Sequence, residues 1–352
     1  MKRSLSPLQS LEKSLASGRG VRRFFGIVFV LLIVAGLGVG GVWYLGPFRA
    51  TQEETFFQID RGTSSRNIAE RLNQEGLVRS PWAFLAARAL HPRVRLQAGE
   101  YRFGAEQTPF EIFDKIQRGQ VYFDVVTIPE GSNMFDIAGI IEKSTHIKAV
   151  DFLKAATDPA AIRDLDPSAP NLEGYLFPSS YEVTHSTSAV QLCRMMTTEF
   201  HKEWGKLENG ALPRGELHRV VTLASLVEKE TGLGNERPIV ASVFSNRLHL
   251  NMPLQCDPTT VYAAMLENHY NGVIHKSDLA STNPYNTYAH AGLPPGPIAN
   301  PGAQSLKAAL HPADDHYLYF VARADGSGGH HFTSTLAEHE KAVADFRRAS
   351  RP

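Results

Sequence analysis

Glu230 is the side chain of this sequence that is best placed for acid–base chemistry. Leu223, Val227 and Glu230 recur at i, i+4 and i+7, so on a helix they share one largely apolar face. In the last helical turn the carboxyl also meets the negative end of the helix dipole. Apolar surroundings and the dipole both disfavour the ionised form and raise the pKa of Glu230, which is what a general acid requires.

The end of this helix is expected at Gly232, because a glycine just past the last turn can adopt the left-handed conformation at little cost. Two alternatives to a catalytic Glu230 stay open. Glu228 lies nearly as close to the apolar stripe, and the spacing separates the two glutamates only weakly. Either of them can also be a solvated glutamate at a helix end.

A second group of polar side chains lies in proline-bounded segments that combine amide, carboxylate, hydroxyl and aromatic groups. Sugars are bound by such sets, with apolar ring faces on aromatic side chains and hydroxyls on polar ones. The candidates for substrate binding are Gln255, Asp257, Tyr285, Asn286, Thr287 and Tyr288. Asp257 is also expected as the N-cap of a helix with Pro258 at its first position, and Asn286 has the alternative of holding its own turn.

Several other chemistries lack their sequence signature. The chain has no GxSxG elbow and no HExxH motif, and Cys193 and Cys256 are not in a CxxC or Cys/His pattern. We therefore expect no metal site. The two cysteines are expected as buried free thiols, with a single disulfide as the alternative. The 36 basic and 36 acidic residues balance, which argues against a nucleic-acid partner.

An apolar segment near the N-terminus predicts a membrane anchor. No charged residue lies between Phe24 and Phe48, and about 20 apolar residues span a bilayer. We expect a transmembrane helix over residues 24–46, and the lysines and arginines of residues 1–23 place that tail in the cytoplasm. The rest of the chain then lies outside the cytoplasm. A cleaved signal peptide is the alternative.

An internal repeat follows the anchor and predicts a first αβ subdomain. The segments 59–72 and 128–141 match at a spacing of 69 residues, and each is expected to form a strand, a glycine turn and a helix capped by Ser or Thr. They resemble LysM modules, which bind glycans containing N-acetylglucosamine, although a plain αβ packing unit is an alternative. We expect an α+β protein with a LysM-like glycan-binding region over residues 52–150 and a mixed α+β catalytic domain over residues 151–352.

Five further motifs of the second half, together with the EKE motif, resemble those of the endolytic murein transglycosylases (the MltG or YceG-like family). In sequence order they are LASLVEKET (223–231), ASVFSNRL (241–248), MPLQCDPT (252–259), YNTY (285–288), GLPPGPI (292–298) and the pair YLYFV (317–321) with GHHF (329–332). Cys256 departs from the threonine that is common in the family. The resemblance implies that Glu230, the second glutamate of EKE, is the catalytic residue.

The resemblance also implies what the protein does and where. It implies a single-pass enzyme of the inner membrane, with a cytoplasmic N-terminus and a periplasmic catalytic domain, working without a cofactor. Such an enzyme cuts nascent peptidoglycan strands between N-acetylmuramic acid and N-acetylglucosamine, leaves 1,6-anhydromuramyl ends, terminates elongation and accompanies peptidoglycan synthases. The alternative is a non-catalytic, membrane-tethered scaffold that binds peptidoglycan.

Overall fold

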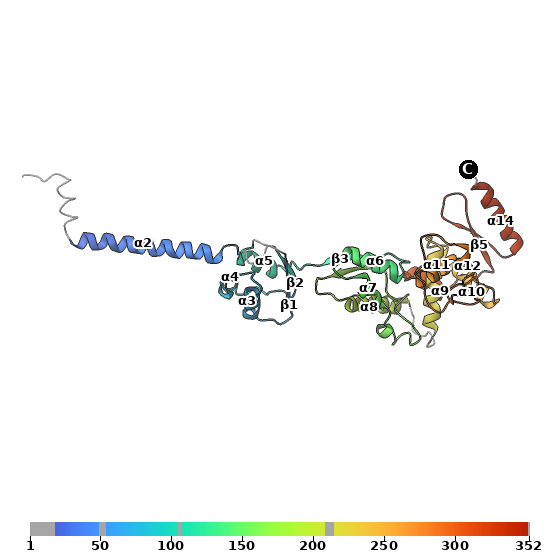
Figure 1. Cartoon of the computed structure of the whole chain (residues 1–352), viewed down its shortest axis with the longest axis horizontal. Coiled ribbons are helices and arrows are strands. Elements are labelled where there is room, and N and C mark those ends of the chain that lie inside the picture. Colours follow the sequence, from blue (N-terminus) through green and yellow to red (C-terminus); the bar gives the residue numbers. More distant parts are fainter. Residues whose placement is uncertain (1–17, 49–53, 105–106, 208–214, 351–352) are drawn as a thin grey trace, which may run out of the picture. The chain divides into compact units, whose positions relative to one another are not determined.

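A computed structural model describes residues 18–48, 54–104, 107–207 and 215–350 of the chain (Figure 1). It is a mixed α+β structure with two compact units, Met1–Tyr122 and Phe123–Pro352. Each unit has its own hydrophobic core.

Helix α2 (Gly18–Leu45) precedes the globular part of the first unit. Its segment Arg22–Leu45 is long and apolar enough to cross a membrane, and its side chains are exposed. A signal sequence would satisfy the same criterion. Most of the expected cytoplasmic tail, residues 1–17, falls outside the described residues.

The first unit closes around a pair of antiparallel strands. Strand β1 (Thr55–Ile59) pairs with β2 (Gly99–Phe103), with Phe57 opposite Tyr101. Between and after the strands come α3 (Ser65–Gln74), α4 (Pro81–Leu90) and α5 (Pro109–Gln117). Phe57, Tyr101 and the apolar faces of the three helices form one buried cluster. The alternating apolar residues of β1 and the apolar faces of the helices therefore pack into one common core.

The second copy of the repeat belongs to the second unit, so the observed boundary after Tyr122 differs from the expected boundary at residue 150. Strand β3 (Asp124–Thr127) pairs antiparallel with β4 (Ser180–Val183), after α6 (Met134–Ser144), α7 (Ala149–Ala156) and the short 3-10 turn Pro159–Ala161. The partner strand lies more than 50 residues further along the chain, and no local sequence pattern predicts this pairing.

Both copies of the repeat form the expected strand, glycine turn and helix. Gly62 and Gly131 have φ of 85° and 75°, in the left-handed region that glycine adopts easily. Ser64 caps α3 as expected, whereas Asn133 and not Ser132 caps α6. In each copy two helices follow the turn before an antiparallel strand closes the motif. A glycan-binding role of this motif stays a prediction.

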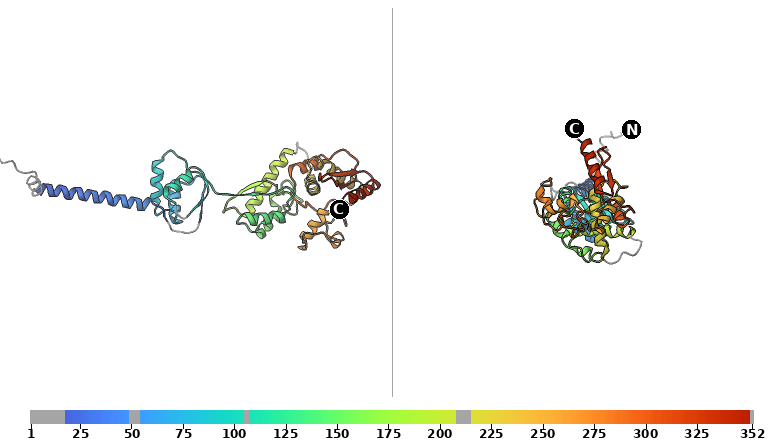
Figure 2. Two further views of the ribbon diagram at one scale, coloured as in Figure 1. Left: turned by 90° about the horizontal axis from the view of Figure 1, so that it is seen from above. Right: turned by 90° about the vertical axis from the view of Figure 1, so that its right-hand side faces the viewer.

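Helix α9 (Glu216–Glu230) forms the centre of the second unit. Its residues 220–227 are all buried, and it packs against α10 and α13 and also contacts α11. The other elements of this part are α8 (Ala189–Leu207), α10 (Arg237–His249), α11 (Asp257–Leu266), α12 (Lys276–Leu279), α13 (Ala303–Leu310), β5 (Tyr319–Ala322), β6 (His330–Thr333) and α14 (Leu336–Ala349). The hairpin β5–β6 and α14 lie together at the red end of the colour scale (Figure 2).

The Glu173 side chain forms hydrogen bonds with three separate segments of the chain in the core. Its buried carboxylate accepts hydrogen bonds from the Met134 backbone N–H at 2.9 Å, the Tyr262 hydroxyl at 3.0 Å and the Asn300 amide at 2.8 Å. Burial raises the pKa of Glu173 to about 7 in spite of these donors. The proline-rich segment 283–297 contains no helix or strand, and its Tyr285 ring packs against the ring of Tyr262 in this core.

Candidate active site

A cavity of about 290 Å³ opens at the C-terminal end of α9, where Glu230 is the last helical residue. It is lined by Glu230, Phe244, Arg247, Leu254, Gln255, Asp257, Tyr288, Phe320 and His339. These residues come from α9, α10, α11 with the segment before it, the proline-rich loop, β5 and α14. The stable core helix α9 thus presents one carboxyl to a cavity built by several distant segments.

The environment of Glu230 favours its protonated form. Burial is the main cause that raises the pKa of Glu230, and the nearby Asp257 carboxylate adds to it. The Cys256 thiol donates a hydrogen bond to Glu230, and this bond and the charge of Arg247 act in the opposite direction. The pKa of Cys256 is raised well above its usual value by burial, so this thiol keeps its proton and remains a donor.

The chain leaves helix α9 at Thr231, so Gly232 lies just past the helix end as expected, but the left-handed conformation expected of Gly232 is wrong. Thr231 is the C-cap with extended backbone (φ −141°, ψ 133°), and Gly232 has no positive φ. The Thr231 hydroxyl accepts a hydrogen bond from the Leu233 N–H at 3.1 Å and donates one to Glu236 at 3.3 Å. These side-chain contacts fix the exit from the helix, so no left-handed glycine is required.

Glu228 points away from the cavity into a buried ion pair. Its Oε1 lies 3.0 Å from Nη2 of Arg237, and its Oε2 accepts the Gly302 N–H at 3.0 Å. The Glu228 and Arg237 side chains are 5% and 8% exposed. The geometry therefore gives Glu228 a structural contact and leaves Glu230 as the carboxyl of the cavity.

Asp257 lies in the cavity, but it does not cap a helix as expected. Cys256 is the N-cap of α11, and Asp257 is its first residue, with Pro258 next. The exposed Asp257 carboxylate instead accepts a hydrogen bond from the Tyr288 hydroxyl at 2.5 Å. The expected N-cap is thus displaced by one residue, which leaves the carboxylate available at the cavity.

Gln255 stands at the cavity rim in an unusual backbone conformation. Its φ is 52°, in the left-handed region that non-glycine residues seldom occupy, and its N–H donates to the Thr287 carbonyl at 3.2 Å. Such a conformation costs of the order of 1 kcal/mol or more and is often found at functional sites. The strained turn places the Gln255 side chain on the cavity wall.

Three of the residues proposed for substrate binding lie behind the cavity wall instead. Asn286 is fully buried, and its amide nitrogen donates to the carbonyls of Leu279 and Ser281 at 3.1 and 2.7 Å. The buried Thr287 hydroxyl accepts the Cys256 N–H at 3.0 Å, and Tyr285 packs against a core tyrosine. The structure thus gives these three residues contacts that shape the loop, whereas Gln255, Asp257 and Tyr288 face the cavity.

Five residues that line the cavity are not among the predicted site residues: Phe244, Arg247, Leu254, Phe320 and His339. Phe244 and Phe320 form an edge-to-face pair at 6.2 Å, and Arg247 and His339 supply the basic groups. Arg247 sits on a helix without amphipathic spacing that would mark it, and His339 lies in the polar C-terminal helix. Only the family-like motif around Arg247 could have drawn attention to it.

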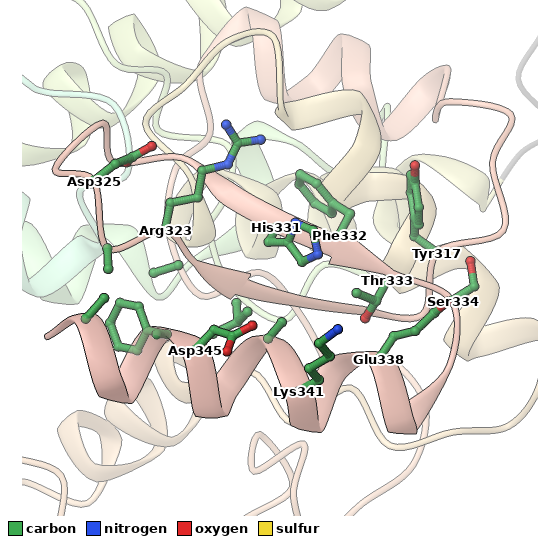
Figure 3. A pocket seen from close by; sticks show the side chains of 16 residues that line it. Tyr317, Arg323, Asp325, His331, Phe332, Thr333, Ser334, Glu338, Lys341 and Asp345 are labelled. Atoms are coloured by element: carbon green, nitrogen blue, oxygen red, sulfur yellow. The ribbon is translucent and has the colours of Figure 1, made fainter.

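A larger hollow of about 680 Å³ lies between the β5–β6 hairpin and α14, away from Glu230 (Figure 3). Tyr317 and Phe332 flank it from the hairpin side, and Lys341 and Asp345 extend from the helix. Within the described ranges, no group of three His, Cys, Asp or Glu side chains is arranged to hold a metal ion. Cys193 and Cys256 are both buried free thiols, as expected.

Comparison with known proteins identifies the family. The model of the YceG-like family matches residues 57–345. The chain belongs to the YceG-like family. Its relatives include the endolytic murein transglycosylase of Bacillus subtilis, which is 35% identical over 90% of this chain and 91% of its own length. A relative of the same name from Streptococcus pneumoniae is 27% identical, covering 91% of this chain and 64% of that protein.

A solved structure agrees with this family assignment. The crystal structure of a yceG-like protein from Listeria monocytogenes is 31% identical and superposes with a TM-score of 0.52, covering 83% of this chain and all of that one. The YceG-like chain is therefore an enzyme, and the alternative of a non-catalytic scaffold is set aside.

Proposed function

We propose that the protein is a membrane-anchored endolytic lytic transglycosylase that cleaves nascent peptidoglycan between N-acetylmuramic acid and N-acetylglucosamine. The observation that carries this proposal is the Glu230 carboxyl at the end of α9, which has a raised pKa and is open to a cavity. The names of the Bacillus and Streptococcus relatives, both endolytic murein transglycosylases, support the murein substrate.

Glu230 supplies the proton and later takes one back. Its carboxylic acid donates to the glycosidic oxygen as the bond from that oxygen to the muramyl C1 breaks. The muramyl 6-hydroxyl oxygen then bonds to C1, and its proton passes to the Glu230 carboxylate. Glu230 is regenerated, and the product carries a 1,6-anhydromuramyl end without added water.

The internal nucleophile favours this route over hydrolysis. A hydroxyl of the same sugar can have an effective concentration several orders of magnitude above that of an external reactant, which benefits ring closure over attack by water. Asp257 is the other carboxylate of the cavity, and no helix cap occupies it. Glycoside hydrolases use one carboxyl group as the acid and a second as the base or nucleophile. Asp257 is therefore the residue that a competing hydrolytic mechanism would use as the second carboxylate.

Digestion of purified glycan strands by the full chain in detergent, in oxygen-18 water, tests the mechanism. We expect anhydromuramyl ends that carry no label. Labelled reducing ends would show hydrolysis and assign Asp257 as the base. The same digestion with Glu230→Gln should give neither product while glycan binding persists.

The first unit and α2 complete the proposed picture. We infer that α2 anchors the chain in the inner membrane with residues 1–23 in the cytoplasm and the catalytic unit in the periplasm. The LysM-like motif β1–α3–α4–β2 then holds glycan while the second unit cleaves it and ends strand elongation. Peptidoglycan synthases that produce nascent strands are the expected partners.

A further inference from the structure

The C-terminal helix α14 contributes one residue, His339, to the wall of the Glu230 cavity. This helix packs on β5 and β6, yet none of its residues is buried. The hollow under its second half separates it from the hairpin, and Lys341 and Asp345 extend into that space (Figure 3). The contact of α14 with the catalytic cavity is therefore made at His339.

A stack of three side chains holds His339 in place. The Tyr319 ring lies 5.1 Å from the His339 ring with an interplanar angle of 22°, and the Arg247 guanidinium lies 5.2 Å from the Tyr319 ring centre. Arg247 itself is fixed, because its Nε donates to the Leu318 carbonyl at 2.7 Å and its Nη1 to the Leu254 carbonyl at 2.9 Å. The imidazole thus rests on an ordered support.

The two nitrogens of His339 have different surroundings. Nδ1 is buried and has no hydrogen-bond partner among the residues that the structure describes. An unpaired buried donor costs about 1–3 kcal/mol, and unsatisfied acceptors are the more common exception. The neutral ring therefore carries its proton on Nε2, the other ring nitrogen.

The charge of the ring agrees with this assignment. Burial and the nearby Arg247 guanidinium both lower the pKa of His339, against a smaller opposing effect of Glu340. At neutral pH the ring is neutral and offers one N–H donor, and the ring lines the cavity. Sugar hydroxyls and acetamido carbonyls are acceptors for such a donor.

We propose that His339 contacts the substrate directly, its Nε2–H donating a hydrogen bond to an oxygen atom of the glycan bound beside Glu230. The C-terminal helix then completes the substrate site instead of only covering the hairpin. This inference rests on the proposed function of the Glu230 cavity, and its test separates the two.

The test uses full-length protein in detergent and two readouts, the KM for glycan strands and the affinity of the Glu230→Gln background for uncleaved strands. His339→Ala should raise KM and weaken binding about 3- to 10-fold, the range of one neutral hydrogen bond. His339→Gln retains an N–H donor and should recover most of that loss. Lys341→Ala, on the same helix but facing the hollow, is the matched control and should change neither readout.

Thermal unfolding of each variant checks that α14 stays in place. Unchanged KM and affinity in His339→Ala overturn the proposal, and so does an equal loss in His339→Ala and His339→Gln. If Glu230→Gln retains turnover or fails to bind glycan, the function proposed for the cavity is wrong, whatever His339 does.

Discussion

The same substitution, glutamate to glutamine, should have opposite effects at the two glutamates of the EKE motif. Glu230→Gln and Glu228→Gln introduce the same neutral amide on the same helical turn. The structure predicts that the first variant loses turnover and keeps its stability, whereas the second loses stability and keeps its chemistry.

The loss in Glu228→Gln follows from its buried ion pair with Arg237. Removing one partner of such a pair costs about 3–5 kcal/mol, because the other charge remains buried. Gln304 at 3.2 Å and Glu130 at 3.6 Å still face the guanidinium, and the new amide can still accept the Gly302 N–H. We therefore expect about 3 kcal/mol, which lowers the Tm of a domain of this size by about 6–12 °C.

Glu230→Gln should behave in the reverse manner. Loss of a general acid lowers turnover about 10²- to 10⁴-fold. The folded-state pKa of Glu230 is raised, so the wild-type carboxyl loses stability as the pH rises above 4.5 toward that pKa. The neutral amide avoids this loss, and its Tm at pH 7 should equal or exceed the wild-type value.

Turnover of glycan strands and calorimetric Tm, measured on the same preparations, decide the matter. The reasoning fails if Glu228→Gln abolishes turnover at an unchanged Tm while Glu230→Gln remains active. It also fails if both variants unfold early, since Glu230 would then have a structural contact that the cavity does not show.

Four further outcomes follow from the structure. Because the pKa of Glu173 is raised to about 7, this residue makes the free energy of unfolding fall by about 3 kcal/mol as the pH rises from below 4.5 to above 7. Chemical denaturation at a series of pH values should show this fall, and Glu173→Gln should reduce it. Asp257→Asn removes a charge that raises the pKa of Glu230, so the alkaline limb of the kcat/KM profile should move to lower pH; an unmoved limb would contradict the contact. A reporter fused after residue 350 should be active only outside the cytoplasm, and cytoplasmic activity would reverse the topology. Deleting residues 54–122, which form a core of their own, should weaken glycan binding and leave turnover of short glycans; complete loss in a folded variant would count against this division of roles.

Local patterns predicted the parts of this fold that depend on neighbours in sequence. The apolar stripe through Leu223 and Val227 gave helix α9 and the position of Glu230 at its end, and the glycine turns at Gly62 and Gly131 were found from the repeat alone. The residues that cap the helices were predicted less accurately. Asp257 has the residue type of an N-cap, but the helix begins at Asp257 itself with Cys256 as its N-cap, and the aspartate is bound by Tyr288 instead.

The rest required long-range information. Strand β3 was expected in the first subdomain, whereas it belongs to the second unit, because its partner β4 is set by the core that both share and not by a nearby turn. Asn286 and Thr287 were proposed as substrate-binding residues because amide and hydroxyl side chains form hydrogen bonds with a ligand and with the backbone of a loop equally well. His339 could not be assigned, because a histidine in a polar helix shows nothing of the tyrosine ring on which it lies.

The order in which the cavity is completed has a consequence for the synthesis of the protein. Helix α9 and the Asp257 segment are made before β5 and α14, and His339 is the last of the wall residues along the chain. A chain broken or terminated before that point retains the central carboxyl but has an open, unfinished cleft. The cavity of an enzyme that cuts the polymer on which cell integrity depends is thereby complete only after His339 has been synthesised.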